Sequence, residues 1–142
     1  MRSVLLVFAW FIFCGAAHAK DSKSVGDWVF IGNQGDGDSY YSKSSVDRDG
    51  DFVNVRTVIN IKTGKNFTKE SDGFKSYVGY FAIDCKRWLY VLTHSFRYEE
   101  TFGQGKLVLG FDEKKSIAEE DIKPIDKTHL LHKLAVAVCK KH

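Results

Sequence analysis

The chain has 142 residues, of which 44% are hydrophobic and 14% aromatic, and its formal net charge is +3. This composition excludes an intrinsically disordered chain and a collagen-like or coiled-coil repeat. Because both signs of charge are interspersed, +3 gives no indication of nucleic-acid binding, and no nucleic-acid partner is expected. The length predicts a single compact domain.

The first nineteen residues have the pattern of a secretory signal peptide. Arg2 supplies a positive charge, residues 4–13 are an unbroken apolar run, and Ala17-His18-Ala19 offers the small residues that signal peptidase reads. A transmembrane helix needs ~20 apolar residues, and the charges that begin at Lys20 cut this run short. No later segment is long or apolar enough to span a bilayer. We therefore predict cleavage after residue 19, export to the periplasm or the cell surface, and no transmembrane segment in the mature chain.

The three cysteines divide into one in the signal segment and two in the mature chain. Lipidation of Cys14 is an alternative to simple cleavage, but the bulky Phe13 precedes it where a lipoprotein needs a small residue. In an oxidising compartment, Cys85 and Cys139 are expected to form a disulfide. Two buried free thiols are the alternative, and no CxxC spacing indicates zinc.

Short strands joined by turns are predicted after a polar, flexible leader at residues 20–27. Asp49-Gly50 predicts a hairpin, because glycine accepts the positive φ that a tight turn requires. A two-residue turn there would pair Val46 with Val53 and Tyr40 with Ile59. The predicted strands cover 27–31, 39–48, 52–61, 77–83, 88–98 and 106–111, with loops at 32–38, 62–75 and 112–127.

The last segment changes from strand to helix periodicity. Apolar residues recur there at spacings of three and four, which predicts a helix over Thr128 to Cys139 with Asp126 or Thr128 as its cap. Cys85 falls on the core-facing side of its strand by two-residue alternation. The fold class is therefore α+β: about six antiparallel strands in one sheet, with one C-terminal helix packed on the concave face and tied by the disulfide.

A series of short features follows the chain in a recognisable order. They are Trp28 in the first strand, Tyr40-Tyr41 in the second, the Asp49-Gly50 turn, Asp84-Cys85 at a strand end, the Gly103-Gln104-Gly105 turn and the terminal Val138-Cys139. Their order and spacing, from residue 28 to residue 139, resemble the bacterial surface-adhesin protein E family. The chain has Ile117 and Ile122 in the last loop, where a tryptophan is expected for that family.

The resemblance implies both a fold and a function. It implies a six-stranded antiparallel sheet with a C-terminal helix tethered by a disulfide, here over residues 28–142. The family's namesake is a surface lipoprotein that attaches bacteria to host cells and binds vitronectin and laminin. The resemblance therefore implies an exported, non-enzymatic binding protein that adheres to host matrix or envelope proteins. The alternative is a periplasmic small-ligand-binding or envelope housekeeping protein whose concave sheet face holds a ligand.

The residue patterns typical of catalytic and metal sites are incomplete. The acidic segment at residues 47–51 resembles the start of an EF-hand loop but lacks its final glutamate, and His129 and His132 lack an obvious third ligand. No serine stands in a glycine elbow, and no glycine loop precedes a helix as a phosphate site needs. No catalytic residue, metal or cofactor is expected.

Basic residues are the candidates for contact with a partner. They could form a surface that meets an acidic protein or glycan, or they could be a solvated loop. Tyr40 and Tyr41 point to opposite faces of their strand, so one of them is a candidate exposed anchor. The basic candidates are Lys62, Lys65, Lys69, Lys75, Lys86, Arg87 and Arg97.

Overall fold

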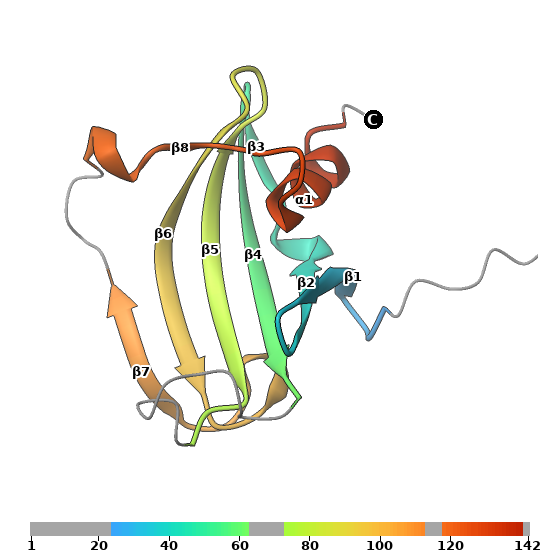
Figure 1. Ribbon diagram of the computed structural model, residues 1–142, viewed down its shortest axis with the longest axis vertical. Helices are drawn as coiled ribbons and strands as arrows, with labels where there is room; N and C mark the ends of the chain where they lie inside the picture. Colours follow the sequence, from blue (N-terminus) through green and yellow to red (C-terminus); the bar gives the residue numbers. More distant parts are fainter. Residues whose placement is uncertain (1–23, 63–72, 113–117, 141–142) are drawn as a thin grey trace, which may run out of the picture.

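The computed structural model describes residues 24–62, 73–112 and 118–140, which form one curved antiparallel sheet with a single helix on its concave face (Figure 1). The main path of the sheet runs β1-β2-β4-β5-β6-β7, while β3 pairs with β4 and β8 pairs with β6. The predicted fold class is confirmed. The predicted strand 39–48 is divided into β2 and β3, and the predicted loop 112–127 contains the short strand β8. The elements are β1 (Trp28–Gln34), β2 (Gly37–Ser42), β3 (Asp47–Asp49), β4 (Phe52–Ile61), β5 (Ser76–Asp84), β6 (Leu89–Tyr98), β7 (Leu107–Asp112), β8 (Lys123–Pro124) and α1 (Leu130–Val138).

The first hairpin is tighter than its glycines suggested. Residues 32–38 are not a loop, because β1 and β2 stay paired as far as Gln34 and Gly37. Gly35 has a φ of 56° and so supplies the left-handed conformation of a two-residue turn. Gly32 has a different role: a Cβ there would lie 2.6 Å from Cδ2 of Leu130, so its missing side chain lets α1 approach the sheet.

The second hairpin has a register that the two-residue turn at Asp49-Gly50 did not predict. Phe52 pairs with Asp49, so Gly50 and Asp51 form the turn. Val53 consequently pairs with Arg48 instead of Val46, and Tyr40 pairs with Val58 instead of Ile59. The second change arises because a 3₁₀ turn (Lys43–Ser45) interrupts the first arm and adds residues to it.

Asp27 at the end of the leader holds this 3₁₀ turn. Its carboxylate accepts hydrogen bonds from the Ser44 amide at 2.8 Å, the Ser44 hydroxyl at 2.7 Å and the Ser42 hydroxyl at 2.5 Å. The Ser42 hydrogen bond is the largest cause of the lowered pKa of Asp27. The described end of the leader is thereby attached to the sheet.

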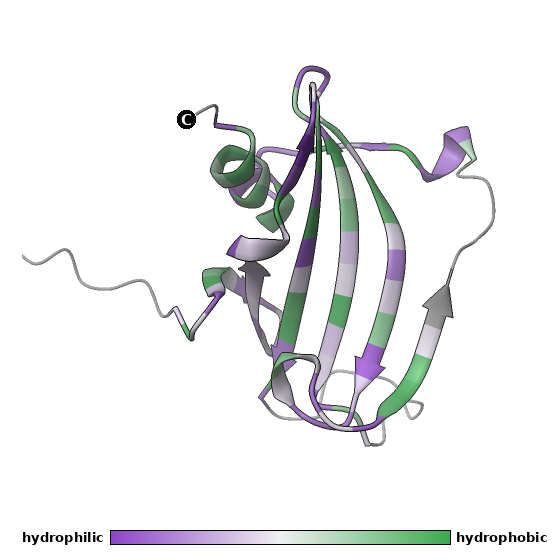
Figure 2. Ribbon diagram, turned by 180° about the vertical axis from the view of Figure 1, so that it is seen from behind, coloured by the Kyte–Doolittle hydropathy of each residue, from purple (hydrophilic) through white to green (hydrophobic). Residues whose placement is uncertain are grey.

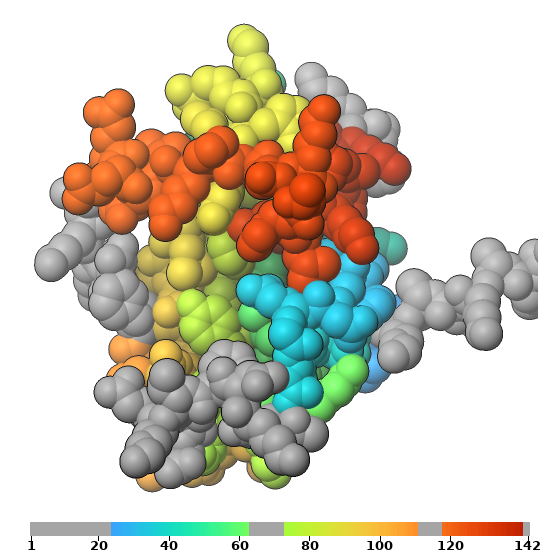
Figure 3. Space-filling model, in the orientation of Figure 1, coloured from blue at the N-terminus to red at the C-terminus, as the bar shows by residue number. Residues whose placement is uncertain are grey.

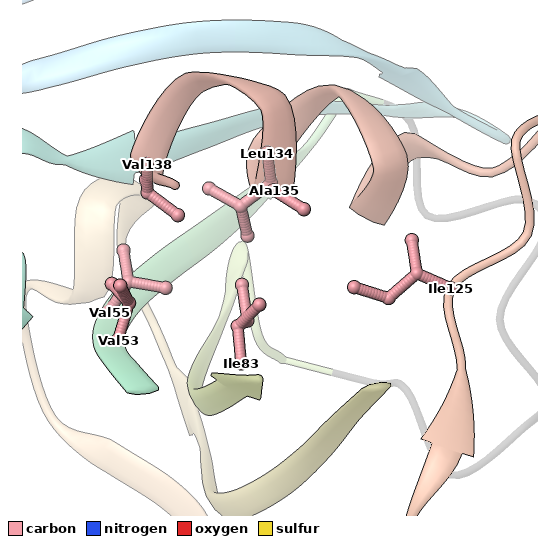
Figure 4. Packing of buried hydrophobic residues seen from close by; sticks show 7 residues of the cluster. All are labelled: Val53, Val55, Ile83, Ile125, Leu134, Ala135 and Val138. Carbon is pink, nitrogen blue, oxygen red and sulfur yellow. The ribbon is translucent and has the colours of Figure 1, made fainter. Parts of the chain in front are cut away.

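The core lies on both faces of the sheet. On the concave face, Leu134, Ala135 and Val138 of α1 pack against side chains from β4 and β5, with Ile125 closing one side (Figure 4). A second cluster on the opposite face is built on three buried residues, of which Val58 is fully inaccessible. It gathers Tyr40, Val58 and Val78 with the partly buried aromatics Trp28, Phe30, Phe96, Tyr98 and Phe102. The helix is therefore not the only cover that the sheet has.

Helix α1 begins later than the predicted Thr128 and uses a different cap. His129 is the N-cap, and its Nδ1 accepts a hydrogen bond from the Leu131 amide at 3.3 Å. Asp126 and Thr128 were wrong as caps, since Asp126 instead accepts hydrogen bonds from the Thr128 amide and hydroxyl, both at 2.8 Å. This turn precedes the helix and orients its entry.

Candidate binding surfaces

The disulfide ties α1 to the β5–β6 turn. Cys85 directly follows β5, Cys139 is the C-cap of α1, and their Cα atoms lie 5.5 Å apart in the bonded pair. The predicted disulfide is confirmed. Cys85 also packs against the concave-face cluster, as its strand position predicted.

The neighbouring Asp84 organises the turn that presents Cys85, a role that the sequence reasoning missed. Its carboxylate accepts hydrogen bonds from the amides of Lys86 at 3.0 Å and Arg87 at 2.9 Å, and pairs with Nε of Arg87 at 2.5 Å. The Arg87 amide is the largest cause of the lowered pKa of Asp84, whose side chain is only 7% exposed. The sequence signal of such a turn is an aspartate at a strand end, whose side chain can accept hydrogen bonds from the amides two and three residues later.

The predicted basic surface separates into two groups. The first basic group lies where β5 begins and consists of Lys62, Lys75 and Arg97. Lys62 follows Ile61, whose amide donates a hydrogen bond to the carbonyl of Lys75 at 2.9 Å. Arg97 lies on β6 near the same end of β5. Lys62 is engaged with a carboxylate of Asp38 at 2.7 Å. The guanidinium of Arg97 lies over an aromatic ring, 5.1 Å from its centroid.

The second basic group, Lys86 and Arg87, occupies the turn at the other end of β5. The nine residues of β5 separate the groups by about 30 Å at ~3.3 Å per residue. The described candidates therefore do not form one continuous surface. Lys65 and Lys69 lie outside the described residues.

Strand β7 is an apolar edge of the sheet. It ends the strand path and pairs with β6 on one side, leaving its outer side unpaired among the described residues. Leu107, Val108 and Leu109 are 47%, 42% and 54% exposed, and Figure 2 shows this part of β7 as a hydrophobic segment. Since consecutive strand residues point to opposite faces, apolar surface is exposed on both sides of β7.

The tyrosine pair does not provide the predicted exposed anchor. Tyr40 is 6% exposed in the second cluster, where burial raises the pKa of its phenol. Tyr41 is partly buried against the cluster under α1.

A cavity of about 430 Å³ lies on the concave face beside α1. Its walls are mainly apolar, and two of the lining side chains, Phe81 and Leu92, pack closely around Gly79. Two buried hydroxyl groups, of Ser39 and Thr57, belong to its lining. In Figure 3 the yellow and yellow-green atoms of β5 and β6 are visible between the orange-red β8–α1 segment and the blue β1–β2 hairpin.

The two helix-start histidines have structural roles. His129 caps α1, and His132 stacks on Trp88 with ring centroids 5.2 Å apart. Within the residues that the structure describes, no three histidine, cysteine, aspartate or glutamate side chains gather as a metal site would require.

The fold and the disulfide define a class: a tethered antiparallel sheet with one C-terminal helix, as in surface-adhesin proteins. The model of the family described as surface-adhesin protein E matches residues 28–140, and the chain belongs to this family. The predicted resemblance is thereby confirmed, and the chain is a surface adhesin-like protein. No curated protein matched the sequence.

Solved structures with this fold come from Haemophilus influenzae. Crystal form II of protein E is 18% identical, with a TM-score of 0.61 over 85% of this chain and 93% of that chain. Protein E from non-typeable Haemophilus influenzae is also 18% identical, with a TM-score of 0.59 over 85% of this chain and 80% of that chain. These likenesses show the shared fold. The family implies an exported or surface location, while cleavage after Ala19 stays a prediction. None of the helices in the described parts of the chain has the length and apolar character to cross a membrane.

Proposed function

We propose that this protein is an exported, non-enzymatic adhesin that binds a host matrix protein. The observation that carries the proposal is the family match over residues 28–140, nearly the whole predicted mature chain. The signal-peptide pattern of residues 1–19 supports export. Vitronectin and laminin, the two matrix proteins implied by the family resemblance, are the partners to test first.

The β7 edge is the proposed contact surface. An extended segment of the partner can add to an open sheet edge through main-chain hydrogen bonds, and Leu107, Val108 and Leu109 then offer apolar contacts. Arg97 of the first basic group pairs with Leu109 across the sheet and adds positive charge. The acidic residues Glu99 and Glu100 lie in the β6–β7 connection and offset this positive charge. The proposal therefore rests on the apolar edge more than on net charge.

Surface plasmon resonance tests this proposal with residues 20–142 over immobilised vitronectin and laminin at physiological salt. We expect saturable binding, and a V108K/L109K double variant should weaken it about 30-fold or more, because central apolar contacts contribute ~2 kcal/mol or more. Val136→Lys is the control, since Val136 is 38% exposed on α1, away from β7. Absence of saturable binding to both proteins contradicts adhesion, whereas binding unchanged in the double variant excludes the β7 edge.

The two basic groups can be compared in the same assay. Lys75→Gln removes a charge from the first group, near β7, and Lys86→Gln removes one from the second group about 30 Å away. We expect only Lys75→Gln to slow association, and the difference should shrink as salt is raised. Equal effects of the two substitutions would count against a contact at the β7 end.

The cavity supports a second candidate function, the binding of a small ligand. Its volume of about 430 Å³ falls within the ~300–1,000 Å³ of typical ligand sites, and its apolar walls with few polar groups fit that class. Both functions are compatible, because β7 contributes none of the residues that line the cavity.

A further inference from the structure

We propose that the concave-face cavity binds an elongated, uncharged amphiphile whose hydroxyl or carbonyl group pairs with the hydroxyl of Ser39. The inference rests on the second candidate function and names its ligand class. It follows from the shape of the cavity, from one unsatisfied buried hydroxyl and from the charges at the rim.

The cavity is elongated across the strands. Its lining runs from Ser39 on β2, through Ile59 on β4 and Phe81 on β5, to Leu92 on β6. These four strands are neighbours in the sheet, and three spacings of ~4.8 Å give a length of about 14 Å. The volume of 430 Å³ equals about fourteen water molecules at ~30 Å³ each. A chain of about eight carbons fits this length and volume.

The walls favour an apolar chain. Leucines of α1 cover the floor formed by β4, β5 and β6, so the ligand lies between helix and sheet. Gly79 lets three of the lining side chains pack closely over it: a Cβ there would approach Phe81 Cε2 at 3.0 Å, Leu92 Cδ1 at 3.2 Å and the hydroxyl of Thr57 at 3.3 Å. Burying an aliphatic chain on such a surface contributes about 0.8 kcal/mol for each methylene.

Ser39 provides the polar contact. Its side chain is 5% exposed and lines the cavity, and its Oγ has no hydrogen-bond partner. The other hydroxyl, on Thr57, already donates to the carbonyl of Gly79 at 3.3 Å. A buried unsatisfied hydroxyl is costly, so a ligand group that completes its hydrogen bond is favoured at the Ser39 end.

The charges argue for a neutral ligand. Among the described residues that line the cavity, none at the β2 end carries a positive charge. The ammonium of Lys133 on α1 lies outside the lining, 3.8 Å from where a Cβ of Gly32 would be, and Gly32 pairs with Ser39. A carboxylate or ammonium buried beside Ser39 would lose hydration that no charge of the lining replaces. At the β6 end, Lys123 and Asp121 bring opposite charges to the rim. Two histidines, His94 on β6 and the helix cap His129, also belong to the lining. The rim therefore has no strong preference for either sign.

Three eight-carbon probes separate the ligand class from the function. Octan-1-ol, octanoate and octylamine are titrated into residues 20–142 and followed by methyl shifts in NMR spectra. We expect saturable 1:1 binding of octan-1-ol, with shifts at Ile59, Leu92 and Leu131, and weaker binding of both ions. Tighter binding of either ion overturns the uncharged class while leaving small-ligand binding in place. Binding of none of the three overturns both.

Two pairs of variants locate the site. Ser39→Ala should weaken octan-1-ol about two- to tenfold, the range for one hydrogen bond, whereas Ser95→Ala, on β6 outside the lining, should not. Leu131→Trp should fill the cavity and abolish binding, whereas Val136→Trp adds the same ring on the exposed side of α1 and should leave binding intact. Thermal unfolding identifies any variant that fails to fold. Unaltered affinity in Ser39→Ala overturns the proposed pairing, and unaltered affinity in folded Leu131→Trp overturns the site.

Discussion

Removal of the Cys85–Cys139 bridge should cost a large part of the stability of this domain. The two cysteines are separated by 54 positions. The loop-entropy relation for a closed chain of this length gives about 14 cal/mol/K, or about 4 kcal/mol at 25 °C. Domains of this kind have ~5–15 kcal/mol in total. A C85A/C139A double variant, which leaves no free thiol, should therefore lose up to about 4 kcal/mol.

Urea unfolding of residues 20–142, followed by far-ultraviolet circular dichroism, measures this loss. The slope m should also rise, because a denatured chain without the bridge exposes more surface. Leu134→Ala serves as the contrast: Leu134 is 1% exposed beneath α1, and its truncation should cost ~2–5 kcal/mol through a cavity, with m unchanged.

The pair of variants separates tethering from packing. A loss below about 1 kcal/mol in the cysteine variant, with unchanged m, would refute the chain-entropy argument. It would mean that the contacts of Leu134, Ala135 and Val138 alone hold the helix on the sheet.

Two further predictions concern the turns. Asp84→Asn should lose about 1 kcal/mol at pH 7 by removing the Arg87 ion pair. Folding lowers the pKa of Asp84, so its contribution to stability is present above the unfolded pKa of ~3.9 and is lost as pH falls through the lower folded pKa. The difference in urea midpoint between wild type and variant should therefore be smaller at pH 3 than at pH 7. A constant gap would contradict this. Gly103→Ala should lower the free energy of unfolding by more than about 1 kcal/mol, since φ is 70° and a Cβ would lie 2.7 Å from Val78. Gly26→Ala is the control and should cost less, because Gly26 has a similar φ of 60° but open space around it. Equal melting temperatures of the two variants would count against the steric argument.

The sequence predicted the features that depend on local periodicity and on cysteine number. The helix, the long strands and the disulfide follow from apolar spacing and from two cysteines in an oxidising compartment. The pairing of Tyr40 was mispredicted because a 3₁₀ turn at Lys43–Ser45 interrupts the arm, and this turn is held by Asp27, seventeen residues before Ser44. Strand alternation cannot reveal such a contact.

The candidate sites were harder to predict because they too depend on which distant parts of the chain the fold brings together. The basic residues are close in sequence, yet β5 places Lys75 and Lys86 at opposite ends of the sheet. The cavity depends on side chains from β2, β4, β5, β6 and α1. Their juxtaposition is a property of the tertiary fold, and no segment of the chain carries it alone.

The attachment of α1 has a consequence for the opening motions of the molecule. Among the backbone hydrogen bonds of the described residues, none joins α1 to a strand, so the helix can leave the sheet without breaking the strand ladders. The disulfide then keeps the departed helix at high effective concentration beside its site. Undocking of α1 would then be a local opening, which would expose the concave face while the sheet stays folded.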